Sequence, residues 1–324
     1  MTGLPGMPGS SFLRKWNRRR PVKPLQLEQK QSLWGWVFVA PAILLIAGFS
    51  FIPMFQAAYL SLHSGIANNL TFNGVKTAAN PTGNVFRNYF RLTQDVRFIT
   101  SVKNVFIYLI FQVPIMLFLA LVLASILNNK FLPARGFFRT LVFLPCAVSL
   151  VAASVTFRSL YSLDGLVNTA LLGLKIINEP INWLAHGTWA KVVIIIVITW
   201  RWTGYNTIFY LAGFQNIPSE IYEAARIDGA NAVQQFTKLT LPLLRPVILL
   251  TAIMSTNGTL QIFDEPRIIT NGGPADGTMS ISQYIYTMSF INNPQFGYAA
   301  AAAFTILFMV AALSLIQLKV GDKK

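Results

Sequence analysis

The chain has 324 residues, of which 54% are hydrophobic and 11% are charged, and its formal net charge at pH 7 is +15. Its mean hydropathy of +0.52 excludes an ordinary soluble domain and places the chain in a bilayer. The single cysteine, Cys146, excludes an intrachain disulfide framework and is expected to be a small buried thiol, and two histidines argue against a histidine-based metal centre.

The apolar runs predict an all-α polytopic membrane protein. A hydrocarbon core about 30 Å thick needs roughly 20 apolar helical residues, and backbone groups in lipid must be bonded within the segment. The alternating ten-residue pattern of an outer-membrane barrel is absent. We therefore predict six transmembrane helices, at 33–62, 101–127, 137–160, 190–214, 244–263 and 297–318.

The charged residues predict the orientation of the chain. We expect a basic cytoplasmic arm at 1–33, whose prolines and glycines oppose regular structure, a transmembrane domain at 34–320, and a cytoplasmic tail at 321–324. The apolar run after the arm is too long for a cleaved signal peptide. With the N-terminus inside, 16 of the 26 Lys and Arg residues face the cytoplasm, which predicts that both termini are cytoplasmic. We expect no nucleic-acid partner.

A polar loop at 216–243 interrupts the apolar chain. Pro218 and Ser219 form a helix-start signal in which the serine caps, Gly229 is placed to end that helix with a left-handed residue, and Asn231 is placed to cap a second short helix. Pro242 and Pro246 are expected to close the segment before the next span. Its mixed charges and small side chains favour a surface for protein docking over an amphipathic interfacial linker.

The loop also carries a recognisable signature. Glu223-Ala224-Ala225, three residues, Gly229, nine residues and then Leu239-Thr240-Leu241-Pro242 resemble the EAA motif of permease subunits in ATP-binding-cassette importers. In that family this loop is the coupling helix, which sits in a cleft of the cytoplasmic ATPase. The resemblance assigns ATPase coupling to Glu223, Ala224, Ala225, Asp228, Gly229, Leu241 and Pro242.

Four further stretches extend the resemblance over nearly the whole chain. They are VRFITSVKNVFIY from 96, INWL from 181, WRWTGYNTIFYLAGFQNIP from 200 and IITNGGP from 268, and they resemble the carbohydrate branch of the family, of the type of the maltose importer's first permease. Asn271 stands where the family commonly has glycine; asparagine tolerates a positive φ, so the turn is expected to survive. The resemblance implies the type I importer permease fold.

Polar side chains inside the predicted spans are candidates for a sugar path. Such groups face either the bundle interior, where they bond helix to helix, or a water-filled path, and both readings stay open. Amides with aromatic faces suit a sugar, so we select Tyr205, Asn206, Asn257 and Gln261. Arg201 is added because an arginine at membrane depth must face a cavity, a partner or a carboxylate.

Taken with the resemblance, these features predict an inner-membrane permease subunit that imports an oligosaccharide. The chain has no G-x-x-x-x-G-K-[ST] loop, so it is expected to bind no cofactor itself and to rely on ATP and Mg held by a partner ATPase. The resemblance implies a second homologous permease, two copies of the ATPase and a sugar-binding protein on the outer face. Overall likeness to the alginate importer's permease makes an acidic, alginate-like sugar one candidate.

Two alternatives remain at this stage. One is a permease for another small solute, such as an amino acid or phosphate. The other is a membrane-embedded transferase acting on lipid-linked sugar, which would need catalytic carboxylates such as Asp264, Glu265 and Asp276. Asp264 and Glu265 are neighbours at a helix end and are expected to point in different directions, which argues against a paired-carboxylate site.

Overall fold

The computed structural model describes residues 24–66, 69–78, 80–129, 131–291 and 293–321. The chain divides into two compact units, residues 1–57 and residues 58–324, each described here by itself. Within the described residues, five helices are long and apolar enough to cross a membrane, or six if one bent pair forms a single span. The predicted α-helical membrane fold is confirmed, with a two-stranded hairpin in addition, and the prediction of six spans holds if the bent pair is counted as one span.

The first unit is a helical run that carries the first predicted span. It consists of α2 (Pro24–Ile46), a π-helical turn (Ala47–Phe51) and most of α3 (Ile52–Ser61). Helix α2 already begins at Pro24, so residues 24–33 of the basic arm are helical, and the rest of the arm lies outside the described residues. No residue of its apolar window is buried within the chain, so this surface suits lipid or a partner.

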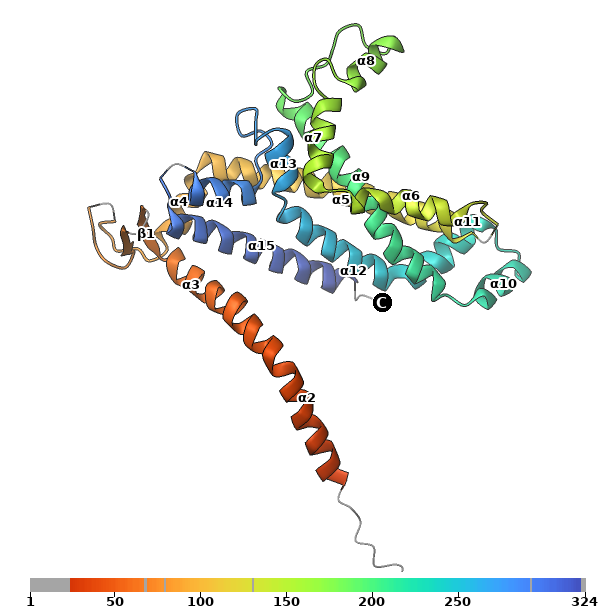
Figure 1. The fold of residues 1–324 in the computed structure, drawn as a ribbon, viewed down its shortest axis with the longest axis horizontal. Helices are drawn as coiled ribbons and strands as arrows, with labels where there is room; N and C mark the ends of the chain where they lie inside the picture. The colour runs from red at the N-terminus through yellow and green to blue at the C-terminus, as the bar shows by residue number, and fades with distance from the viewer. Residues whose placement is uncertain (1–23, 67–68, 79, 130, 292, 322–324) are drawn as a thin grey trace, which may run out of the picture. The chain divides into compact units, whose positions relative to one another are not determined.

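The second unit begins with a β-hairpin and a short helix. Strands β1 (His63–Ile66) and β2 (Asn69–Phe72) pair antiparallel with His63 opposite Phe72. The buried side chain of Asn88, in α4 (Arg87–Gln94), donates to the carbonyl oxygens of Ser61 at 2.8 Å and His63 at 2.7 Å. These bonds hold the hairpin, which Figure 1 shows at the end of this unit opposite the loop that carries α10 (Ser219–Ile227).

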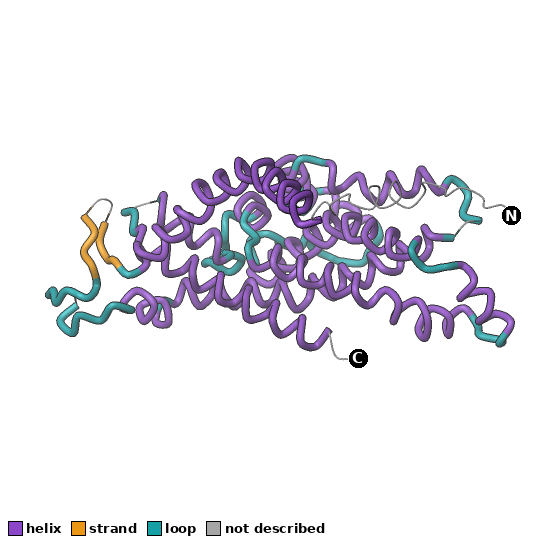
Figure 2. Tube along the Cα trace, turned by 90° about the horizontal axis from the view of Figure 1, so that it is seen from below, coloured by secondary structure: helices purple, strands orange, loops and turns teal. Residues whose placement is uncertain are grey.

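Four long helices form the body of the second unit, and Figures 1 and 2 show them running side by side. Helix α5 packs mainly against α9 and also against α12, while α12 packs against α15. Apolar residues that are completely or almost completely buried, such as Val105, Tyr108 and Ile194, fill the space between them. The helices are α5 (Val96–Asn128), α9 (Gly187–Gln215), α12 (Leu241–Leu260) and α15 (Phe296–Gly321).

The predicted span at 137–160 is not one continuous helix. It is divided into α6 (Arg135–Ala147) and α7 (Leu150–Leu160), which meet at an angle of 93°. Val148 and Ser149 between them have extended backbone angles, and Pro145 removes an amide donor from the last turn of α6. The hydropathy of this window is that of a span, but the backbone changes direction between α6 and α7. Helix α7 then leads to the short helix α8 (Leu166–Gly173).

Two short helices complete the unit between α12 and α15. They are α13 (Asp264–Ile269) and α14 (Ile281–Phe290), joined by a loop in which Asn271 has a φ of +55°. The prediction that Asn271 takes the place of glycine in a left-handed turn is confirmed. Ala299, Ala301 and Ala302 near the start of α15 are at most 2% exposed, whereas Ala300 and Ala303 are half-buried, so small side chains let the first half of this helix pack closely on one side.

Candidate functional site

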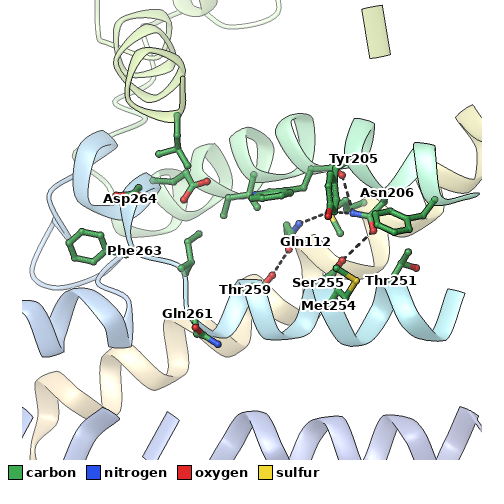
Figure 3. A pocket seen from close by; sticks show the side chains of 18 residues that line it. Gln112, Tyr205, Asn206, Thr251, Met254, Ser255, Thr259, Gln261, Phe263 and Asp264 are labelled. Atoms are coloured by element: carbon green, nitrogen blue, oxygen red, sulfur yellow. Dashed lines mark hydrogen bonds between the residues drawn. The ribbon is translucent and has the colours of Figure 1, made fainter. Parts of the chain in front are cut away.

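A cavity of about 400 Å³ lies between α5, α9, α12 and α13, with Leu150 of α7 also reaching it. Figure 3 shows its lining. Polar atoms are contributed by three different long helices, and aromatic rings come mainly from α9. The lining residues are Gln112, Met116, Leu150, Ile198, Trp202, Tyr205, Asn206, Phe209, Thr251, Met254, Ser255, Gly258, Thr259, Gln261, Ile262, Phe263, Asp264 and Glu265.

Hydrogen bonds connect the polar lining residues across the cavity wall, as Figure 3 shows. Thr259 donates to Gln112 Oε1 at 3.0 Å, and Gln112 Nε2 donates to Met116 Sδ at 3.0 Å. Ser255 donates to Asn206 Oδ1 at 3.5 Å. The amides are thus held in fixed orientations, as a site that recognises hydroxyl groups requires.

Aromatic rings line the α9 side of the cavity. Trp202 and Tyr205 meet edge to face with ring centroids 5.6 Å apart, and Tyr205 meets Phe209 in the same way at 5.1 Å. Their spacing along α9 places them on one helical face. Aromatic faces beside oriented amides are a combination that suits a sugar ring, whose C–H face is apolar and whose rim is polar.

The α13 end of the cavity is acidic. Asp264 is exposed, and Glu265 is only 4% exposed although both line the cavity. The difference in exposure agrees with the expectation that these neighbours point in different directions. Across the part of the chain that the structure describes, no group of three or more His, Cys, Asp or Glu residues is placed to hold a metal ion.

The structure brings together three of the five residues selected for the sugar path. Tyr205, Asn206 and Gln261 line the cavity. Asn257 accepts a hydrogen bond from Gln261, as their spacing of four residues predicted, but is itself absent from the lining. Arg201 is also absent from it. A role of all five in transport stays a prediction.

Arg201 bonds to the break between α6 and α7. Its Nη1 donates to the carbonyl oxygen of Val148 at 2.9 Å, and its guanidinium carbon lies 5.9 Å from the ring centre of Trp202. Cys146, half-buried in α6, donates to the carbonyl oxygen of Arg201 at 2.9 Å. The positive charge is therefore directed to a backbone acceptor that the bend of the chain leaves free.

Several lining residues escaped the sequence reasoning. Gln112 and Thr259 are polar residues within apolar spans, and that signal could have found them, but only the fold shows that they meet across α5 and α12. Glu265 was considered as a catalytic carboxylate and not as part of a transport path. Its burial depends on contacts of α13 with α7 and α9, which are distant in the sequence.

The loop predicted to dock a partner is an exposed helix, α10 (Ser219–Ile227), followed by a turn. Gly229 has a φ of +79° and ends it, and Asn231 caps α11 (Ala232–Gln235) through a capping box with Gln234, so these two predictions are confirmed. The expected cap at Ser219 is wrong, because Pro218 occupies the N-cap position and no side chain caps the helix.

The end of this loop also differs from the prediction. Helix α11 continues through a π-helical turn (Phe236–Thr240) into α12, so Pro242 and Pro246 do not separate the loop from the next span. The amide of Leu241 donates to the carbonyl oxygen of Phe236, five residues back, instead of four residues back as in an α-helix. The helical run continues through this π-type turn, and Pro242 stands in the first turn of α12, where a proline is tolerated. The loop is thereby joined to α12 as one helical run.

Exposed apolar side chains flank the turn of the loop. Ile227 is 87% exposed and Val233 is 71% exposed, whereas Glu223 and Asp228 beside them are exposed carboxylates. Such a mixture of protruding apolar and charged groups is typical of a surface that a protein partner covers. The coupling role of Glu223, Ala224, Ala225, Asp228, Gly229, Leu241 and Pro242 stays a prediction.

A polar cluster joins the start of α5 to the loop after α13, to α14 and to α15. Arg97 pairs with Asp276 at 2.8 Å, and Asp95 accepts from the hydroxyl groups of Tyr284 at 2.6 Å and Tyr298 at 3.0 Å. Burial raises the pKa of Asp95, but the hydrogen bonds from Tyr284, the Phe98 amide, Tyr298 and the Arg97 amide together hold that pKa below its ordinary value. Ionised Asp95 therefore stabilises this end of the bundle.

Comparison with known proteins relates this architecture to transport. The family described as binding-protein-dependent transport system inner membrane component matches residues 93–320. The lactose transport system permease protein LacF of Rhizobium radiobacter is 51% identical over 293 residues, which cover 90% of this chain and 95% of that protein. The trehalose/maltose transport system permease protein MalF of Thermococcus litoralis is 31% identical over 297 residues, covering 91% and 96%.

A solved structure shares the fold. The crystal structure of a bacterial alginate ABC transporter in complex with an alginate pentasaccharide-bound periplasmic protein contains a chain that matches with a TM-score of 0.75. The two sequences are 21% identical, and the match covers 93% of this chain and 98% of the other.

Proposed function

Because the chain belongs to the family of binding-protein-dependent transport system inner membrane components, we propose that it is the permease subunit through which an oligosaccharide is imported. The observation that carries this proposal is the cavity of about 400 Å³, in which Gln112, Asn206 and Thr259 are oriented beside the rings of Trp202 and Tyr205. Its volume suits one or two sugar rings.

The similar proteins support a sugar as the cargo. Relatives named for lactose and for trehalose/maltose transport match this chain over nearly its full length. Tyr205, Asn206 and Gln261 would contact the sugar directly, and Asn257 would hold the Gln261 amide. An acidic, alginate-like oligosaccharide remains a candidate beside a neutral one.

Energy would enter through the exposed loop. Ile227 and Val233 would insert into a cleft of a partner ATPase that holds ATP and Mg. The unbroken helical run from α11 into α12 would transmit a movement of the loop to Thr251, Ser255 and Thr259, which line the cavity. Rocking of the permease between two states would then expose the cavity alternately to each side of the membrane.

The assembly would contain this chain, a second homologous permease, two copies of the ATPase and a sugar-binding protein on the outer face. The periplasmic protein in the structure of the alginate transporter supports the last of these partners. The chain would reside in a bacterial inner membrane with both termini in the cytoplasm, which places α10 on the cytoplasmic side and α13 toward the outer side.

The test is ATP hydrolysis by the reconstituted complex. We expect the binding protein loaded with its sugar to stimulate hydrolysis and to support uptake of radiolabelled sugar into proteoliposomes. The unloaded binding protein and a complex without this chain serve as controls. If no neutral or acidic oligosaccharide stimulates hydrolysis, while an amino acid or phosphate does, the carbohydrate assignment is refuted.

A further inference from the structure

Glu265 is the most deeply buried carboxyl group at the cavity, with 4% of its surface exposed. Its side chain makes no hydrogen bond to another residue of the described chain and forms no ion pair there; its one bonded partner is its own backbone amide. Burying a carboxyl group whose one hydrogen bond is to its own amide is costly, so its remaining oxygen lone pairs favour a partner from within the cavity.

The cations of the chain do not supply that partner. No lysine or arginine is among the residues that line the cavity. Arg201 lies near enough for its charge to act on Glu265, but its guanidinium donates to Val148 and stacks toward Trp202. Asp264 beside Glu265 adds a second carboxyl group to the cavity lining, and Arg267 of the same helix donates to Asn271 outside that lining.

We propose that Glu265, assisted by Asp264, selects the charge class of the sugar: the cavity takes a neutral oligosaccharide by accepting hydrogen bonds from its hydroxyl groups, and it disfavours a uronate. The proposal rests on the proposed function, because it assumes that a sugar enters this cavity. A hydroxyl group is both donor and acceptor, so it satisfies a carboxyl group that is buried beside apolar neighbours such as Ile198 and Ile262.

Electrostatics provides the discrimination against an acidic sugar. A uronate carboxylate has only acceptors, so where it faces Glu265 it cannot donate to that side chain, and ionised Glu265 and Asp264 would repel its charge. Two like charges about 5 Å apart repel each other, at an effective dielectric constant near 20, strongly enough to weaken binding at least about tenfold. The amides Gln112, Asn206 and Gln261 are neutral and do not offset this repulsion.

The test measures direct binding to the intact complex without the binding protein, which applies its own selection. The complex is held in the ATP-bound state by an ATPase subunit unable to hydrolyse ATP, and binding of radiolabelled lactose and of digalacturonate is measured by equilibrium dialysis. We expect wild-type complex to bind lactose at least about tenfold more tightly than digalacturonate. In the Glu265→Gln variant this ratio is expected to fall to about threefold or less, and Asp264→Asn is expected to lower it in the same direction.

The ratio of the two affinities is the decisive readout, because partial loss of folded complex reduces both signals equally. Glu179→Gln, which removes an exposed carboxylate from a loop outside the cavity, should leave the ratio unchanged. Equal or tighter binding of digalacturonate, or an unchanged ratio in Glu265→Gln, overturns the proposal while leaving sugar import intact. Absence of binding by either sugar, together with absence of ATPase stimulation by any sugar, refutes the proposed function and the proposal with it.

Discussion

Gly204 of α9 lies directly against the backbone of α6, and replacing it by alanine should separate the two helices. A Cβ atom on Gly204 would overlap the carbonyl oxygen of Val142, a backbone atom that cannot rotate away. Overpacking of this kind costs about 1–3 kcal/mol, and the better helix propensity of alanine offsets up to about 1 kcal/mol of that. We therefore expect a net loss of about 1–2 kcal/mol in the free energy that holds α6 against α9.

Cys146 offers an assay for this separation because it is the single cysteine and lies in α6 with its thiol bonded to the Arg201 carbonyl of α9. If labelling requires opening of this contact, Gly204→Ala should raise its rate of modification by about 5–30-fold, the factor that corresponds to 1–2 kcal/mol. Gly136→Ala in the same α6 is the matched control, since a Cβ there meets no atom within 4 Å. Labelling rates and melting temperatures of Gly204→Ala equal to those of the control would refute the close-packing argument.

Three further outcomes follow from particular contacts. The pKa of Asp95 in the folded chain is below its ordinary value of 3.8, so ionised Asp95 stabilises the fold fully above pH 3.8, and this stabilisation is lost as the pH falls through the lower folded-state pKa. Asp95→Asn should therefore remove this acid-induced decrease in melting temperature. A decrease that is unchanged in the variant would show that another group causes it. Asn168→Ala should lower the free energy of unfolding by about 2–4 kcal/mol, because the Asn168 side chain bonds the backbone of Ile181 and the indole of Trp183. Limited proteolysis should then cut the loop between these residues faster in this variant than in the exposed control Asn178→Ala. Gly229→Val should abolish sugar-stimulated ATP hydrolysis, because a β-branched residue is strained at a φ of +79° and would change the shape of the docking turn. Full stimulation, equal to that of the exposed control Thr237→Val, would contradict docking through this turn.

Features set by local chemistry were predictable from the sequence. The left-handed residue at Gly229 and the cap at Asn231 depend on neighbouring backbone groups alone, and both occur as expected. The long spans follow from hydropathy, which responds to length and composition. The error at Ser219 has the same local origin, because Pro218, with a fixed φ, competes for the cap position.

Features set by contacts between distant segments were not predictable. The window around Pro145 has enough apolar residues for a span, and its 93° bend depends on the packing of α6 against α9 and of α7 against α13. The cavity likewise requires Gln112, Asn206 and Thr259 to meet from three helices separated by up to 147 positions. The pattern of apolar and polar residues within one segment does not predict which polar residues of another segment will contact it.

Arg201 and the bend between α6 and α7 carry a consequence for how this chain can vary. A lipid environment penalises a guanidinium group and also penalises an unbonded carbonyl such as that of Val148, but the hydrogen bond between them offsets part of each penalty. A relative that replaces the arginine by an apolar residue is expected to straighten the bend or to supply another donor for that carbonyl. A change of the arginine should therefore be accompanied by a compensating change at or near the bend, 53 residues away in the sequence.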